Sequence, residues 1–226
     1  GVHGENFSMM FDKKEGGISS LKYNGFEYIT RTPKVSFWRA MTDNDTGASE
    51  PYNLAQWYVA GKFAKYKTVS WLEQEDALKI IFTYQAACVP TFEFTVTYTA
   101  HFDGKLGVCI NYVGVSGMPD MPVLALDFKM KKQLCNFQYY GLGPDENYSD
   151  RCEGARLGLW KSTAKENLSG YLNPQECGNR TGVRTLSVHD DMQHGLTFQK
   201  ASAPFEMSVL PYSAYELENA MHLDEL

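Results

Sequence analysis

The residues with the densest potential for chemistry lie near the middle of the chain, in the stretch from Tyr139 to Arg151. Glu146 stands there among other charged side chains, just after a Gly-Leu-Gly-Pro turn of restricted geometry. Two carboxyl groups can hydrolyse a glycosidic bond, and Glu146 with Asp43 is a conceivable pair, although the sequence sets no distance between them. An arginine–carboxylate clamp that only holds the loop in shape is the alternative, and the residue types leave both readings open. The polar residues of this stretch are Asp145, Glu146, Asn147, Asp150 and Arg151.

Two further polar clusters, at residues 37–47 and 171–184, also combine glycine or proline with an arginine. The Asp-Asn-Asp run of the first is reminiscent of a calcium loop. It lacks the alternating ligands, the glycine at position six and the glutamate at position twelve of an EF-hand. We therefore predict an ordered loop without a metal, in which Arg39 pairs with Asp43 or Asp45. The candidate residues are Arg39, Asp43, Asn44 and Asp45 in the first cluster, and Glu176 and Arg180 in the second.

Composition argues against several other kinds of function. The chain contains no phosphate-binding glycine loop, nucleophile elbow or metal-binding histidine cluster. Its net charge of -6 argues against a nucleic-acid surface, and no apolar run approaches the ~20 residues that cross a membrane. Widely and irregularly spaced cysteines fit neither a zinc site nor a disulfide framework, so we expect buried, reduced thiols. They are Cys88, Cys109, Cys135, Cys152 and Cys177.

The elements that must position these clusters are mostly short strands. Asn24-Gly25 and Asp103-Gly104 predict tight hairpins, and residues 92–102 alternate apolar with polar side chains as a half-buried strand does. Helices are expected over residues 53–63, capped by Asn53, and over residues 213–220. The other expected strands are 7–12, 18–23, 26–30, 69–72, 78–84, 106–115, 123–130, 137–140, 154–160, 183–189, 195–200 and 205–211.

No repeat, linker or low-complexity tract divides the chain. We therefore predict one all-β domain over residues 1–226, a large antiparallel β-sandwich with one or two short helices. Ordering three polar loops is entropically unfavourable unless they support one another. We expect them to meet at one end of the sandwich, with Arg39, Arg151 or Arg180 bridging between clusters.

Three segments together resemble one known family. They are Trp38 to Gly47, Gly141 to Arg151 and Asn173 to Thr181, and the segment Tyr215 to His222 is a further match. The chain resembles the C-terminal small-chain domain, domain 5, of the β-galactosidases of glycoside hydrolase family 2, in order and over nearly its whole length.

The resemblance implies a supersandwich fold like that of galactose mutarotases, and a parent enzyme that hydrolyses terminal β-galactosides. It places the two catalytic glutamates on a separate (β/α)8 barrel, and the magnesium and sodium ions largely on other domains. No catalytic residue, metal site or cofactor is therefore expected here. The implied partners are the remaining domains, including the barrel, the galactoside substrate and further copies in a homo-oligomer. The loop candidates would structure the rim of the active site and the subunit contacts.

The chain departs from the family pattern at two places. Cys177 stands where the family commonly has asparagine, and nothing after His222 matches the glycine-rich segment that follows in the family. We therefore expect an excised, C-terminally incomplete piece. The alternative is a free-standing carbohydrate-binding or mutarotase-like protein. A mutarotase needs a histidine paired with a carboxylate, and the five histidines lie outside the three polar clusters.

Overall fold

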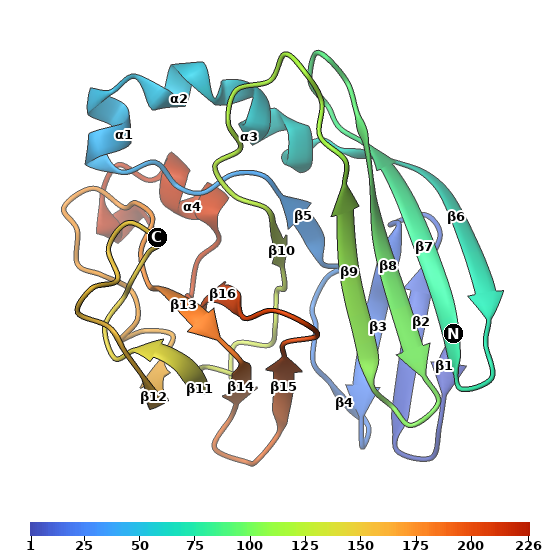
Figure 1. Cartoon of the computed structure of the whole chain (residues 1–226). Helices are drawn as coiled ribbons and strands as arrows, with labels where there is room; N and C mark the ends of the chain where they lie inside the picture. The colour runs from blue at the N-terminus through green and yellow to red at the C-terminus, as the bar shows by residue number, and fades with distance from the viewer. The chain divides into compact units, whose positions relative to one another are not determined.

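The computed structural model describes residues 1–226, and the chain divides into two compact units, Gly1–Lys131 and Lys132–Leu226. Strands in antiparallel sheets are the main regular secondary structure of both units, together with a few short helices (Figure 1). The predicted all-β antiparallel class is confirmed. No helix of the chain has the length and apolar character needed to cross a membrane.

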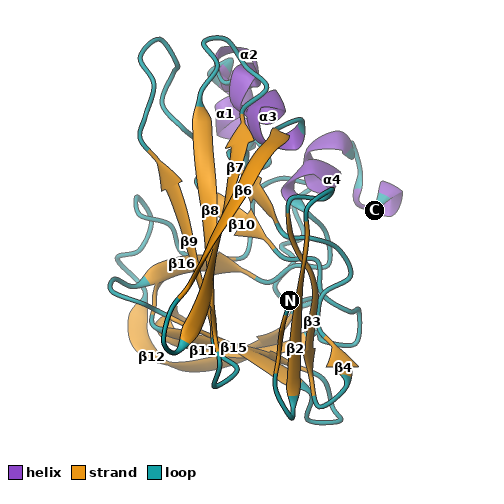
Figure 2. Ribbon diagram, turned by 90° about the vertical axis from the view of Figure 1, so that its right-hand side faces the viewer, coloured by secondary structure: helices purple, strands orange, loops and turns teal.

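Unit 1 is built on two four-stranded antiparallel sheets and one two-stranded sheet, which can be followed in Figure 2. The first sheet has the order β1-β2-β3-β4, with β1 (Val2–His3), β2 (Phe7–Asp12), β3 (Gly17–Tyr23) and β4 (Phe26–Glu27). The second has the order β6-β7-β8-β9, with β6 (Lys65–Glu73), β7 (Ala77–Gln85), β8 (Glu93–His101) and β9 (Leu106–Tyr112). The two-stranded sheet pairs β5 (Lys34–Ser36) with β10 (Ala125–Asp127).

The core of unit 1 lies between its two large sheets. Along β8, Phe94, Val96 and Tyr98 are buried while the residues between them are half-exposed, as their alternation predicts. The ring of Tyr98 lies 5.5 Å from that of Phe11 on β2 in a tilted arrangement, so aromatic side chains of the two sheets contact each other in the core. The predicted hairpins are present, with Asn24, Gly25 and Gly104 all at positive φ.

Two expectations about the segment between β5 and β6 are wrong. Residues 43–47 were expected to be a loop, but they form helix α1 (Asp43–Gly47), because Thr42 and Asp45 make a capping box. The single helix expected over 53–63 is instead α2 (Glu50–Asn53) followed by α3 (Ala55–Lys62), with Leu54 between them. Asn53 therefore ends α2 and does not cap α3.

Unit 2 contains a four-stranded sheet of order β12-β11-β14-β15 and the pair β13-β16. Phe137, Tyr139, Leu186 and Val188 form its buried face. No strand was expected before residue 183 in this part of the chain, but residues 179–182 already belong to one. The strands are β11 (Asn136–Gly143), β12 (Arg156–Thr163), β13 (Asn179–Val183), β14 (Thr185–His189), β15 (Gly195–Gln199) and β16 (Phe205–Ser208).

The C-terminal helix prediction is confirmed by α4 (Ala214–Asn219), where Ser213 and Glu216 form a capping box. A 3₁₀ turn, η1 (Leu223–Glu225), follows. The cysteines are all unpaired, but the expectation that they are buried holds only for Cys177. Cys109 and Cys135 are exposed. Cys109 is exposed because it lies opposite Thr97 on the polar face of an edge strand.

Candidate functional site

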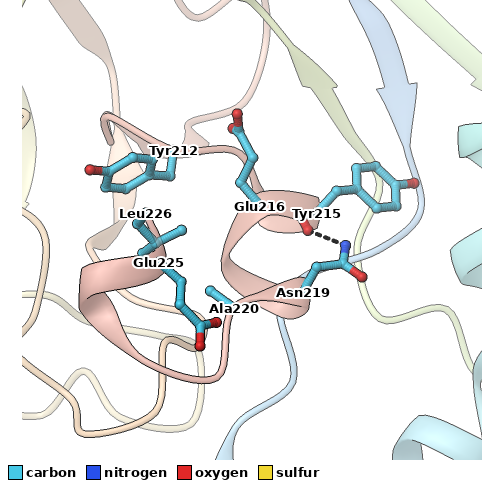
Figure 3. A pocket seen from close by; sticks show the side chains of 7 residues that line it. All are labelled: Tyr212, Tyr215, Glu216, Asn219, Ala220, Glu225 and Leu226. Carbon is cyan, nitrogen blue, oxygen red and sulfur yellow. Dashed lines mark hydrogen bonds between the residues drawn. The ribbon is translucent and has the colours of Figure 1, made fainter.

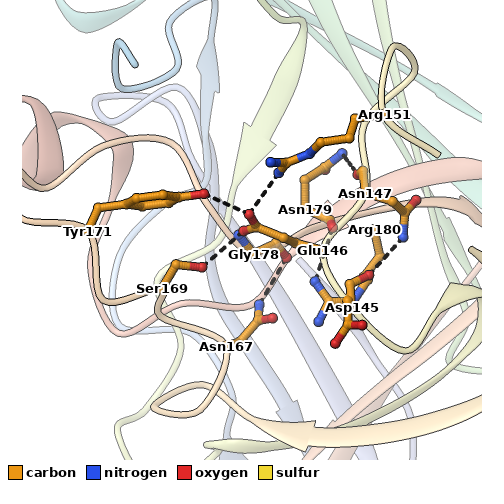
Figure 4. A network of polar contacts seen from close by, with 10 residues as sticks. All are labelled: Asp145, Glu146, Asn147, Arg151, Asn167, Ser169, Tyr171, Gly178, Asn179 and Arg180. Carbon is orange, nitrogen blue, oxygen red and sulfur yellow. Dashed lines mark hydrogen bonds and ion pairs between the residues drawn. The ribbon is translucent and has the colours of Figure 1, made fainter. Parts of the chain in front are cut away.

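Glu146 is the centre of a polar network in unit 2 (Figure 4). Its carboxylate accepts hydrogen bonds from the backbone N–H of Gly178 at 2.8 Å and from the Tyr171 hydroxyl at 2.9 Å. The Ser169 hydroxyl donates at 3.0 Å, and Arg151 Nη2 at 2.7 Å completes an ion pair. These donors come from the loop after β11 and from the irregular segment before β13, so one carboxylate joins two stretches of chain.

Electrostatics keep Glu146 ionised. Burial raises its pKa, but the hydrogen bonds from Gly178, Tyr171, Ser169 and Arg151 outweigh burial and leave the pKa below its ordinary value. A general acid needs a raised pKa, and a nucleophile needs an accessible oxygen. The arrangement instead suits a carboxylate that orders a loop.

Asn147 and Asn179 connect the same two stretches a second time. Asn147 is buried, and its side-chain amide donates to the Leu142 and Asp145 carbonyls at 3.0 Å each. Its Oδ1 accepts from the Thr181 N–H at 3.0 Å and from the Thr181 hydroxyl at 2.6 Å. Asn179 Nδ2 donates to the Asn147 carbonyl at 3.0 Å, and the Asn147 N–H donates back to the Asn179 carbonyl at 2.9 Å. Every polar atom of the Asn147 side chain is therefore satisfied.

Arg180 forms the bridge between clusters that was predicted for Arg39, Arg151 or Arg180. It is 6% exposed, and its Nε donates to the Pro144 carbonyl at 3.0 Å and to the Tyr139 hydroxyl at 2.9 Å. Its Nη1 donates to the Asn179 carbonyl at 3.1 Å. The second and third polar clusters thus meet in unit 2, around residues 144–151 and 176–181.

Two glycines are required at this junction. Gly178 has φ +72°, and a Cβ there would lie 2.6 Å from Asn167 Nδ2 and 2.7 Å from the Asn167 carbonyl oxygen. A Cβ on Gly143 would collide with the Tyr139 hydroxyl that Arg180 uses. Larger residues at either position would therefore displace the network.

The first polar cluster lies in unit 1, and its predicted ion pair is confirmed for Asp45. Arg39 Nη1 and Nη2 contact the two Asp45 carboxylate oxygens at 2.6 and 2.9 Å, a bidentate geometry. The Thr42 N–H and hydroxyl each donate to the same carboxylate at 2.8 Å. Burial raises the pKa of Asp45, but the Arg39 and Thr42 hydrogen bonds prevail and lower it to about 2. That this cluster joins the other two stays a prediction.

The remaining candidates are less enclosed. Asp43 and Asn44 are exposed on α1. Asp150 is exposed in the tight turn that the reciprocal backbone bonds of Tyr148 and Arg151 close. Glu176 is half-buried beside buried Cys177, and its charge contributes, after burial, to the raised pKa of that thiol.

Asp190, in the turn between β14 and β15, was not among the residues predicted from the sequence. This residue is 5% exposed, and its carboxylate accepts from Gln133 Nε2, the Met192 and His194 N–H groups and His194 Nδ1, each at 2.9 Å. Burial raises the pKa of Asp190, but these hydrogen bonds lower it to about 2. An Asp-Asp pair in a hairpin has the pattern of a solvated turn, so no local signal identified it.

A surface pocket in unit 2 lies against α4 and η1 (Figure 3). Its acidic side chains are engaged locally. Glu216 accepts from the Ser213 N–H at 2.7 Å, and Glu225 accepts from the Met221 N–H at 2.7 Å. The other lining residues are Tyr212, Tyr215, Asn219, Ala220 and Leu226.

The carboxylates at the centre of the polar clusters are held by internal donors and are not grouped as the ligands of a metal ion. No three or more His, Cys, Asp or Glu side chains gather where they could hold one, whereas hard cations favour several oxygen ligands at once. The carboxylates of Glu146 and Asp45 face arginine and N–H or hydroxyl donors.

Comparison with known proteins identifies relatives along the whole chain. The family model described as "Beta galactosidase small chain" matches residues 3–226. A β-galactosidase of Halalkalibacterium halodurans is 41% identical over 229 residues, covering all of this chain and 23% of that protein. A β-galactosidase of Streptococcus thermophilus is 38% identical over 226 residues, covering all of this chain and 22% of that protein.

A third relative is a separate polypeptide. The β-galactosidase small subunit of Latilactobacillus sakei is 33% identical over 256 residues, covering all of this chain and 80% of that subunit. The chain thus spans less than a quarter of the length of the two larger relatives and most of the length of the small subunit. It belongs to the β-galactosidase small-chain family.

Proposed function

We propose that this chain is the accessory small-chain domain, domain 5, of a β-galactosidase of glycoside hydrolase family 2. In this proposal the complete enzyme hydrolyses terminal β-D-galactosides, and its catalytic carboxylates lie on another domain, a (β/α)8 barrel. The small chain would structure the rim of the active site and contacts between subunits. It would do so with a carbohydrate-binding, mutarotase-like sandwich.

One observation carries the proposal. The family match covers residues 3–226, and a relative named as a small subunit aligns with the whole chain over 80% of its own length. A segment that other proteins hold both inside a longer β-galactosidase and as a separate small subunit is best understood as an accessory part of that enzyme.

The geometry of Glu146 supports the same assignment. Retaining and inverting glycosidases both need two carboxyl groups flanking the bond that breaks, one of them protonated. Glu146 has a lowered pKa and four donors on its carboxylate. Its chemistry suits ordering of loops 144–151 and 169–181 better than proton transfer.

The implied ions and partners follow from this role. If the complete enzyme uses magnesium and sodium, we expect its other domains to hold them, since the carboxylates of Glu146, Asp45 and Asp190 are occupied by internal donors. The partners would be the barrel and the remaining domains, and further copies of the enzyme in a homo-oligomer.

Activity of the purified chain tests the proposal. We expect no hydrolysis of a chromogenic β-galactoside by the chain alone, and hydrolysis by the complete enzyme that carries it. Glu146→Gln is the informative variant. Turnover by the purified chain that Glu146→Gln abolishes would show that the chain is itself a glycosidase, and would overturn the accessory role.

A further inference from the structure

The outer face of the four-stranded sheet of unit 2 has an apolar corner, formed by Leu157 and Leu159 on β12 and by Tyr140 and Leu142 on β11. The register pairs Leu157 with Leu142 and Leu159 with Tyr140, so all four lie on one face of the sheet. Leu159 is 81% exposed, Leu157 46% and Tyr140 38%. We refer to these four residues as the β12 corner.

The β12 corner does not belong to the core of its own unit. The residues between its members, such as Tyr139 and Trp160, point to the opposite face, where Phe137, Leu186 and Val188 are buried. β12 is also an edge strand of the sheet. An exposed edge with large apolar side chains is an aggregation hazard unless something covers it.

The rest of the same face is polar, which makes the corner a localised patch. Gln138 of β11, Ser187 of β14 and Thr197 of β15 lie across from one another on this face. Two cations flank the corner: Lys161 pairs with Gln138, and the Arg184 guanidinium lies 5.5 Å from the centroid of the Tyr140 ring. An apolar centre with a polar margin is the usual composition of a protein–protein contact. The margin here is positive, in contrast to the net charge of -6 of the whole chain.

We propose that the β12 corner is a docking surface for the remainder of the β-galactosidase. The partner surface that it contacts would be a patch of apolar side chains bordered by carboxylates. This inference rests on the proposed function. A small subunit that is a separate polypeptide, as in the Latilactobacillus sakei relative, can be held by the rest of an enzyme only through non-covalent contacts. Such contacts bury apolar side chains at their centre, and the corner presents exposed apolar side chains on a regular sheet. The positive margin from Lys161 and Arg184 specifies acidic neighbours on the partner.

Hydroxyl-radical footprinting of the complete enzyme and of the isolated chain tests the proposal without a mutation. The rate of oxidation of the Leu159 side chain should be about fivefold or more lower in the complete enzyme than in the isolated chain, because the centre of an interface excludes water. Leu72 is the matched control, since it is a 61% exposed leucine on β6, an edge strand of the sheet β6-β7-β8-β9 in unit 1. Phe137, 1% exposed, gives the rate of a buried side chain.

Substitution gives a second readout. Leu159→Lys should lower the yield of assembled, active enzyme by about thirtyfold or more, the size of an interface hot spot. Leu72→Lys should leave that yield unchanged, and Leu159→Met should restore it. Neither lysine variant should shift the melting temperature of the isolated chain, because both positions are exposed. This comparison separates a docking defect from misfolding.

Three outcomes would overturn the docking surface while leaving the accessory function intact. The first is unchanged oxidation of Leu159 in the complete enzyme, and the second is equal protection of Leu72. The third is protection of Leu159 in the isolated chain that grows with its concentration, because the occupant would then be a second copy. Hydrolysis by the isolated chain is a different result and bears on the proposed function itself.

Discussion

At the scale of single residues, Glu146 makes the most informative test of the network. Glu146→Gln keeps the shape of the side chain but replaces one acceptor oxygen by a donor, which then faces hydroxyl, N–H or guanidinium donors. Hydrogen bonds to a charged group contribute about 1.5–3 kcal/mol, so we expect the free energy of unfolding to fall by roughly 2–3 kcal/mol at pH 7. Urea denaturation measures it. Asp150→Asn, at the exposed tip of the same loop, is the control and should change stability by less than about 0.5 kcal/mol.

The effect of Glu146→Gln should depend on pH in one direction. The pKa of Glu146 is lowered in the folded chain, so its ionised form stabilises the fold above the unfolded value of about 4.3. That contribution is lost as the pH falls through the folded-state pKa. The stability difference between wild type and variant should be full at neutral pH and should shrink in acid. A difference that grows in acid would mean that Glu146 is protonated in the fold.

Gly178 tests the backbone of the same network. Gly178→Ala places a Cβ within 2.7 Å of the Asn167 backbone carbonyl oxygen at a φ of +72°, which costs about 1–2 kcal/mol from the left-handed conformation alone. We expect a loss of stability of at least that size. Gly154→Ala has open space around the added methyl and should be neutral or slightly stabilising. Equal melting temperatures for the two variants would contradict this account.

At the scale of elements, the sequence predicts strands where side chains alternate and fails where polar residues are buried. Along β8, buried and half-exposed side chains alternate almost residue by residue, as the sequence predicts. β13 reads Asn-Arg-Thr-Gly-Val, which has no apolar period, and it is nonetheless buried because Asn147 and Glu206 satisfy Asn179. β10 is shorter than its apolar run because β5, its partner, has three residues. The bounds of these strands depend on tertiary contacts, which the local sequence pattern does not reveal.

α1 is the element most dependent on one side chain. Its sequence Asp-Asn-Asp-Thr-Gly has low helix propensity, and Asp45 supplies both the capping box and the ion pair with Arg39. Asp45→Asn should therefore lower the stability of unit 1 by about 1–2 kcal/mol, the size of a lost cap, whereas Asn44→Ala on the exposed side should not destabilise it. Urea denaturation compares the two variants.

The ionisation of Asp45 should also be visible in acid. Because its pKa is lowered to about 2, below the unfolded value of about 3.9, its contribution is present above pH 4 and is lost between about pH 4 and pH 2. Amide chemical shifts of residues 42–47 followed by NMR report this loss. Shifts that titrate above pH 4 would contradict the Arg39 pairing.

At the scale of the whole molecule, the sequence could identify the polar residues of the site but not all their partners. Arg180 and Glu146 were recognisable from charge beside glycine and proline. Ser169 and Tyr171 are neutral residues in an irregular segment, and only the fold brings their hydroxyls to Glu146. Asp190 was missed for the related reason that its four donors come from its own turn and from Gln133, far away in sequence.

Whether the two compact units unfold together is the last prediction. Unit 1 has its own core around Phe82 and Tyr98, and unit 2 has one around Phe137 and Val188. A core of its own allows a unit to open separately, and exchange then reports the stability of that unit. We expect Glu146→Gln to speed amide hydrogen exchange in β11 and β13 while leaving β7 and β8 at wild-type rates. Asp45→Asn should do the reverse, accelerating exchange in unit 1 only. Equal acceleration of all four strands by either variant would instead favour the single cooperative domain over residues 1–226 that the sequence suggested, because the loss of one network would then be transmitted to both cores.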